Sequence, residues 1–245
     1  MSKRVQLISL WCGPVALGVF VLGFWGIAGF VPPPSPAASA QQIADLFRDH
    51  RVQIQLGMLL TQIAAALTGP WVAVISVQMK RVEGSSSPLA YLQLGMGMLS
   101  ILLFIFPAMA WEAAAFRADR DAETVRLMND VAWLPFVGVF AIGSLQLTAV
   151  AVCAFQDVDH LVFPRWVGWL NVFMAMGFAP VALIQFFKTG PFAWNGLISF
   201  WVPFALFWLW FVIMFLVLRT AIRGRDHKET AHAALHQPAA GITAP

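Results

Sequence analysis

Six long apolar segments, separated by short polar stretches, dominate this chain of 245 residues. A helix needs about 20 predominantly apolar residues to cross the hydrocarbon core of a bilayer, and every segment reaches that length. The sequence therefore predicts an all-α, polytopic membrane bundle of six transmembrane helices, with no soluble domain between them. The segments lie near residues 6–30, 53–78, 89–113, 131–155, 166–187 and 197–218.

The composition is consistent with lipid as the solvent for most of the surface. Hydrophobic residues make up 60% of the chain and charged residues only 11%, with a mean hydropathy of +0.75. A soluble domain carries roughly a quarter of its residues as charges. The net charge of +3 is too small to indicate a nucleic-acid partner, and the basic residues stand in short clusters between the apolar segments.

Lysine and arginine residues predict which side of the membrane each loop faces. The N-terminus, the loops at 79–88 and 156–165 and the C-terminal tail hold nine of them, against six in the alternate set. This excess predicts cytoplasmic termini, with a transmembrane domain over 1–219 and a flexible polar tail over 220–245. The apolar run at 5–31 is longer than the roughly 7–15 residues of a signal-peptide core, so it predicts a retained first span.

The outer loops carry three local predictions. Ser39, with Gln42 three residues later, predicts a capped short helix that lies at the membrane interface. Residues 116–133 mix charges along a helical pattern and predict a solvated extension of the third span. In FFKTGPFAWNG, at 186–196, Gly-Pro predicts a turn and Asn195 a cap for the last helix.

Five residues are predicted to anchor the bundle at the two interfaces, where amphipathic rings and long basic side chains lie at headgroup depth. They are Arg165, Trp166, Trp169, Lys188 and Trp194. The first three stand at the start of the fifth span, and the other two lie in the turn before the sixth.

Each apolar segment also contains one proline, which removes a backbone donor and tends to kink a helix. These residues are Pro14, Pro70, Pro107, Pro135, Pro180 and Pro203. Their kinks could open space between the helices.

The last span is unusually aromatic, with FWVPFALFWLWF at 200–211. Trp201, Phe204, Trp208 and Phe211 share one face at helical spacing. Packing against neighbouring helices is the structural interpretation of this face. The functional alternative is a wall for a flat apolar ligand, such as a quinone, a sterol or an isoprenoid.

Polar side chains inside the spans are further candidates for function. Gln62, Gln146 and Asn171 lie well inside apolar segments, and they could form a cluster with Thr148 if their helices faced one another. Hydrogen bonding between helices is the structural interpretation, and ligand contact is the functional one. We count the first three as candidate ligand-binding residues.

Glu112 is the acid that lies inside a predicted span, next to Trp111. A carboxylate shielded by an indole could titrate unusually and transfer protons, which makes Glu112 the candidate catalytic residue. The structural alternative is an ion pair at headgroup level with Arg117 or with an arginine of the first outer loop.

Other catalytic and metal-binding patterns are weak. Asp157 and His160 are close in an inner loop, but no nucleophile motif accompanies them. His232 and His236 could share a helix face, yet they lie in the polar tail. The chain therefore predicts no metal and no cofactor.

Four stretches resemble motifs of an uncharacterised family of small, six-span bacterial integral membrane proteins. They are PRWVGWLN at 164–171, FFKTGPFAWNG at 186–196, MKRVEG at 79–84 and LMNDVAW at 127–133. The resemblance covers most of the chain. It implies a multi-pass protein of the bacterial inner membrane and implies no particular chemistry.

Three functions remain open. The first is a non-enzymatic membrane protein, surrounded by lipids, that binds or passes a hydrophobic small molecule, and the kinked helices and the aromatic last span favour it. The second is an accessory subunit of a larger membrane complex, or a homo-oligomer, that packs through small residues at Gly13/Gly18 or Gly95/Gly97. The third is a membrane-embedded enzyme that uses Glu112, or Asp157 with His160.

Overall fold

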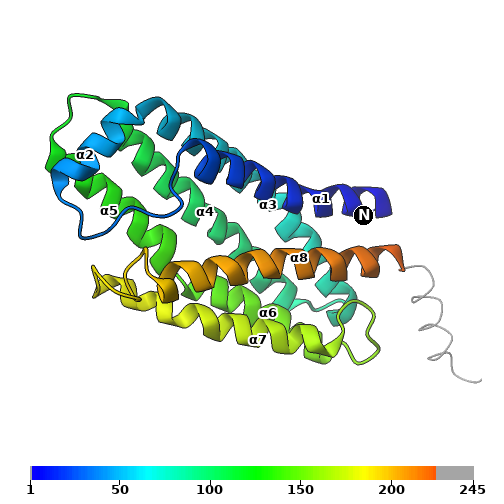
Figure 1. The fold of residues 1–245 in the computed structure, drawn as a ribbon. Helices are drawn as coiled ribbons and strands as arrows, with labels where there is room; N and C mark the ends of the chain where they lie inside the picture. Colours follow the sequence, from blue (N-terminus) through cyan, green and yellow to red (C-terminus); the bar gives the residue numbers. More distant parts are fainter. Residues whose placement is uncertain (1, 225–245) are drawn as a thin grey trace, which may run out of the picture.

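The computed structural model describes residues 2–224, and the regular structure in this range is entirely helical. Six helical stretches are long and apolar enough to cross a membrane, and they run side by side along the bundle (Figure 1). This confirms the predicted six-helix membrane bundle. The stretches are α1 (Lys3–Phe20) with the π-helical η1 (Val21–Ile27), α3 (Arg51–Glu83), α4 (Pro88–Phe116), α5 (Ala122–Gly138) with α6 (Ala141–Gln156), α7 (Arg165–Phe178) with the 3₁₀-helical η2 (Ala179–Gln185), and the π-helical η3 (Leu197–Trp201) with α8 (Val202–Arg223).

The start of α1 and the end of α8 lie at the same end of the bundle, which we call the termini end (Figure 1). The Lys3 side chain donates a hydrogen bond from Nζ to the backbone oxygen of Arg223 at 3.0 Å. The longer connections around residues 28–50, 117–121 and 186–196 lie at the opposite end, which we call the loop end.

A short helix, α2 (Ala40–Asp49), lies across the loop end beside α5 (Figure 1). The predicted capping box is present: Ser39 Oγ accepts from the Gln42 backbone N–H at 3.2 Å, and Gln42 Oε1 accepts from the Ser39 N–H at 2.9 Å. The apolar face of α2, including Ile43 and Phe47, is buried in the protein. The helix therefore covers the end of the bundle, and its apolar side faces protein instead of lipid.

The charged stretch after the third span behaves differently from its prediction. Residues 117–121 interrupt the helix, and the Asp121 carboxylate accepts from the Thr124 backbone N–H at 3.0 Å. This side-chain cap satisfies one of the free donors at the start of α5. The stretch thus begins the fourth span, and the prediction that it extends the third is wrong.

The first and second spans cross at two facing glycines. A Cβ atom built on Gly57 would lie 2.5 Å from the backbone oxygen of Gly23 and 2.9 Å from the backbone nitrogen of Ala28. A Cβ atom on Gly23 would lie 2.7 Å from the Gly57 oxygen. Small residues let helix backbones approach this closely inside a membrane, so these glycines fix the position of η1 on α3.

Aromatic rings fill the loop end of the bundle, next to α2. Trp111 and Trp133 are fully buried with ring centroids 4.9 Å apart, and Phe24, Phe30 and Phe136 pack around them. We call these five residues the aromatic cluster. It closes the loop end of the bundle with a packed core.

The turn at 186–196 ends the fifth span and extends over this cluster. Gly190 adopts a left-handed backbone with φ +80, as the predicted Gly-Pro turn requires. The N-cap of η3 is Gly196, which offers no side-chain bond, so the prediction that Asn195 caps the last helix is wrong. The Ser199 hydroxyl instead donates to the Phe192 backbone oxygen at 3.0 Å.

Trp194 was predicted to lie at headgroup depth, but it is buried. Only 5% of its surface is exposed, and its ring stacks on Trp133 with centroids 6.3 Å apart. Its Nε1–H donates to the backbone oxygen of Pro34 at 2.8 Å. The indole therefore joins the last outer turn to the proline-rich first loop, because a buried N–H needs an acceptor and the loop supplies one.

We expect Trp194→Phe to lower the free energy of unfolding by about 1 kcal/mol. Phenylalanine keeps the ring contact with Trp133 and removes only the hydrogen bond to Pro34. Thermal unfolding in detergent would measure the effect. The matched control is Trp166→Phe, because Trp166 is half exposed on the outer surface. Equal unfolding temperatures for the two variants would contradict the role of this hydrogen bond.

Candidate functional site

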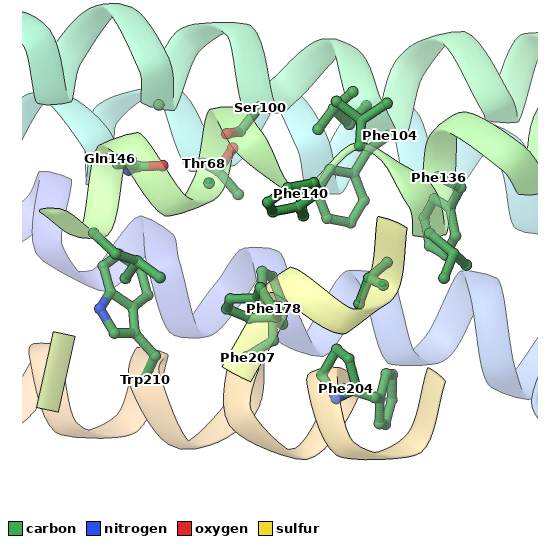
Figure 2. A pocket seen from close by; sticks show the side chains of 18 of the residues that line it. Thr68, Ser100, Phe104, Phe136, Phe140, Gln146, Phe178, Phe204, Phe207 and Trp210 are labelled. Atoms are coloured by element: carbon green, nitrogen blue, oxygen red, sulfur yellow. The ribbon is translucent and has the colours of Figure 1, made fainter. Parts of the chain in front are cut away.

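A cavity of about 240 Å³ lies in the middle of the bundle (Figure 2). Its walls come from α3, α4, α5, α6 and α8, with two residues each from η3 and from the break between α5 and α6, and single residues from α1, α7 and η2. The volume exceeds the ~150 Å³ of an apolar cavity that admits benzene and falls short of the ~300 Å³ at which drug-sized sites begin. It therefore has room for one or two fused rings, or for one end of a longer chain.

Irregular backbone surrounds this cavity. The fourth span breaks between Gly138 and Ala141, the fifth tightens from Ala179, and the sixth begins with a π-helical turn that leads to Pro203. Each of these three spans carries its predicted proline close to the irregular part. Broken helices are tolerated at membrane depth where they are buried or line a cavity, and they are a recurring feature of binding sites in transporters.

Eleven of the 25 residues that line the cavity are aromatic. One side is built by Phe207, Phe204 and Trp210 of α8, with Phe178 at the end of α7 (Figure 2). The other side includes rings from the first, third and fourth spans. These are Phe20, Phe104, Phe136 and Phe140, and Trp71 of α3 lies beside Trp210 with ring centroids 6.4 Å apart.

The Trp210 ring is held in the wall by a second side chain. Its Nε1–H donates to Asn171 Oδ1 at 2.9 Å, and Asn171 Nδ2 donates to the backbone oxygen of Val167 at 2.8 Å. Asn171 is fully buried. It therefore orients the wall from behind, which matches the structural interpretation of this amide and not direct ligand contact.

Three polar side chains lie together along one side of the cavity: Gln146 of α6, Thr68 of α3 and Ser100 of α4 (Figure 2). The Thr68 hydroxyl donates to the backbone oxygen of Ala65 at 2.6 Å, and the Ser100 hydroxyl donates to that of Met96 at 3.0 Å. The remaining lone pairs of both hydroxyl oxygens can still accept a hydrogen bond. The cavity is thus apolar with one polar side.

The seven predicted ligand-binding residues are only partly brought together. Phe204, Phe211 and Gln146 line the cavity. The other four do not: Trp201 is 37% exposed, Trp208 packs beside Phe204, Gln62 is half-buried elsewhere on α3, and Asn171 lies behind the wall. Thr148 is exposed and its hydroxyl donates to the Ser144 oxygen, so the proposed four-residue polar cluster does not form.

The cavity face of α8 is offset from the predicted one. Phe200, Phe204, Phe207 and Phe211 point inward, and Trp201 and Trp208 fall outside. Both sets repeat at helical spacing and share two members, so aromatic periodicity cannot separate them. A finer indication was available in Ser199 and Pro203, because a small polar residue and a proline are unsuited to a lipid-facing position on an intact helix.

Asp157 has a structural role. Its carboxylate is 3% exposed and accepts hydrogen bonds from the backbone N–H groups of Leu161, Val162 and Phe163, at 2.8, 2.8 and 2.7 Å. These bonds fold the loop before α7. His160, by contrast, is exposed with a left-handed backbone, and neither residue lines the cavity.

Glu112 is half-buried on α4 near the loop end. Within residues 2–224, no ion pair joins it to Arg117, to Arg51 or to Arg48, which pairs with Asp45, so the predicted salt bridge is absent. Arg51 instead donates to the backbone oxygen of Phe116 at 2.8 Å, and the Arg117 guanidinium lies over the Phe116 ring. Glu112 does not line the cavity.

The remaining predicted anchors are on the outer surface. Arg165, Trp166 and Trp169 are exposed at the start of α7, and Lys188 is exposed in the last outer turn. These positions suit an interfacial role.

No group of His, Cys, Asp and Glu side chains that could hold a metal occurs within residues 2–224. His232 and His236 lie outside the described residues. The two free thiols are separate: Cys153 is buried and Cys12 is partly exposed near the outer face of α1.

Comparisons with known proteins add no identification. No family model, no curated protein and no solved structure matches this chain. The cavity must therefore be interpreted from its own residues.

Proposed function

We propose that this protein binds a hydrophobic small molecule in the central cavity and does not alter it chemically. The ligand classes that fit are lipids, quinones, sterols and isoprenoids, whose rings or chain ends match an aromatic wall. The observation that carries the proposal is a mid-bundle cavity surrounded by three irregular spans.

The character of the lining supports binding over catalysis. Among the described residues that line the cavity there is no acid, no base and no cysteine. General acid–base or nucleophilic chemistry requires such a group within hydrogen-bond reach of the substrate. Glu112, Asp157 and His160 all lie elsewhere.

The two alternatives have less support. A partner subunit packing on the predicted glycine pairs would need both members on the outer surface. Gly13 is instead buried against Trp71 and Gly97 against Val72, while Gly18 and Gly95 meet open space. An accessory subunit therefore remains a proposal without a defined surface.

We further propose that the protein lies in a bacterial inner membrane with cytoplasmic termini. The excess of lysine and arginine at the termini end supports this orientation. Accessibility of a cysteine introduced at exposed Val158, compared with one at exposed Lys188, would test it in intact cells.

Binding can be tested with a substitution whose side chain fills the cavity. A Cβ atom on Gly143, which lines the cavity on α6, would meet no atom within 4 Å. The Cβ atom of Gly143→Leu therefore meets no neighbour, the rest of the side chain should occupy part of the cavity, and the substitution removes a helix-destabilising glycine. The control is Gly95→Leu, because Gly95 is exposed on α4 with the same open surroundings.

We expect wild type and Gly95→Leu to retain an apolar molecule after mild solubilisation, and Gly143→Leu to lack it while unfolding at the same or a higher temperature. Mass spectrometry of the extracted ligand would measure retention. Added bromonaphthalene, which quenches tryptophan fluorescence on contact, provides a second measurement through Trp71 and Trp210. Quenching that is identical in all three proteins, with identical extracts, would refute the proposal.

A further inference from the structure

Gln146 is the one amide side chain among the described residues that line the cavity. It is 8% exposed, and no hydrogen bond joins its side chain to any residue between 2 and 224. Its side-chain nitrogen and oxygen are not among the unpaired atoms that the protein fully encloses, so they can be reached from the cavity. A molecule bound in the cavity could therefore supply the hydrogen bonds that the protein does not.

The neighbours of Gln146 define what that molecule must offer. A Cβ atom on Gly97 would lie 2.9 Å from Gln146 Nε2, so the amide rests against α4 where a side chain is missing. Ser100 follows three residues later on the same helix. Val72 of α3 also packs on Gly97, and Thr68 lies one helical turn before Val72 on the same helix. Three elements therefore bring an amide and two hydroxyls to one side of the cavity.

The polar groups on this side all present acceptors to the cavity. Thr68 and Ser100 have each given their proton to a backbone oxygen of their own helix, so toward the cavity they can only accept. The Gln146 nitrogen lies against Gly97 of α4, and its side-chain oxygen is directed toward Thr68 and Ser100 (Figure 2). A ligand hydroxyl can donate its proton to one of these oxygens. An ether or a bare carbonyl has no proton to donate and can satisfy none of them.

We infer that the ligand is a lipid-soluble alcohol or phenol, with an apolar ring or branched body against the aromatic wall and its hydroxyl between Gln146, Thr68 and Ser100. This inference rests on the proposed function, because it names the ligand class for the same cavity. Among the classes considered, it selects sterol-like alcohols, isoprenoid alcohols and reduced quinones over hydrocarbons and oxidised quinones.

Three matched probes test the inference in nanodiscs: bromonaphthalene, bromonaphthol and the methyl ether of bromonaphthol. All three share a ring system and a quenching bromine. Bromonaphthalene has no polar group, bromonaphthol has a hydroxyl that can donate and accept, and the methyl ether has an oxygen that can only accept. Binding is the part of the tryptophan quenching that Gly143→Leu removes, compared at equal mole fraction in the bilayer. We expect bromonaphthol to bind about tenfold more tightly than either other probe.

Gln146→Leu should reduce this preference to about twofold or less while bromonaphthalene still binds. Thr68→Val with Ser100→Ala should act in the same direction and provides the test if Gln146→Leu fails to fold. The matched control is Thr148→Val on α6, because Thr148 also bonds to its own helix but is exposed outside the cavity.

The outcomes separate the two proposals. Equal binding of the three probes, or a bromonaphthol preference that survives Gln146→Leu, would overturn the hydroxyl inference and leave the cavity as a binding site. Tight binding of the methyl ether would do the same, because an acceptor alone would then suffice. If Gly143→Leu leaves the tryptophan quenching by all three probes unchanged, the proposed function itself is overturned.

Discussion

Gly57→Val is expected to lower the free energy of unfolding by about 3 kcal/mol, at the upper end of the usual cost of overpacking. The new Cβ atom would overlap the backbone oxygen of Gly23 and the backbone nitrogen of Ala28. Neither atom can rotate away as a side chain would, so the first span must separate from α3. Thermal unfolding followed by tryptophan fluorescence in detergent would measure the loss.

Gly95→Val is the control for this prediction. Gly95 also lies within a long apolar helix, but it is exposed and a Cβ atom there meets nothing within 4 Å. Its variant should be as stable as wild type or slightly more so, because glycine is a poor helix former. Similar destabilisation by both substitutions would show that the Gly23–Gly57 crossing is not the cause.

Asp157→Ala is expected to destabilise the protein by about 3 kcal/mol, since three buried or partly buried backbone donors lose their acceptor together. Asp157→Asn should cost less, because the amide oxygen can still accept from two of the three N–H groups. Hydrogen exchange at Leu161, Val162 and Phe163 would report the effect locally, and thermal unfolding would report it globally.

Val158→Ala is the matched control, one residue away with 81% of its surface exposed. It should leave both measurements unchanged. Asp157→Ala protein that unfolds at the wild-type temperature would mean that water replaces the carboxylate at this loop. Loss of ligand binding in a stable Asp157→Ala protein would instead restore a functional role for this acid.

The sequence predicted the number of spans and the existence of α2 because those depend on local properties. Twenty apolar residues specify a membrane helix wherever they occur, and the Ser39–Gln42 pair caps a helix through bonds within four residues. The charged stretch after the third span was assigned to the wrong span for a related reason. The periodicity of 116–133 is helical, but the Asp121 cap decides on which side of the break the charges fall.

The candidate site was harder to predict because it depends on the rotation of each helix. Aromatic residues occupy so many positions between 200 and 211 that two neighbouring faces fit the spacing equally well. Gln146 and Asn171 look alike in sequence, yet one faces the cavity and the other binds Trp210. The prediction that Trp194 lies at headgroup depth was wrong for another reason: the acceptor of its indole N–H, the oxygen of Pro34, is 160 residues away in the chain.

The break in the fourth span has one more consequence. Val139, within that break, lines the cavity and has 39% of its surface exposed. The loop end is closed by α2 and the aromatic cluster, so an opening beside Val139 would lead sideways into the hydrocarbon of the membrane. A molecule using this route dissolves in the bilayer before it binds. Its partition into lipid, and not its solubility in water, then sets how often the cavity is occupied.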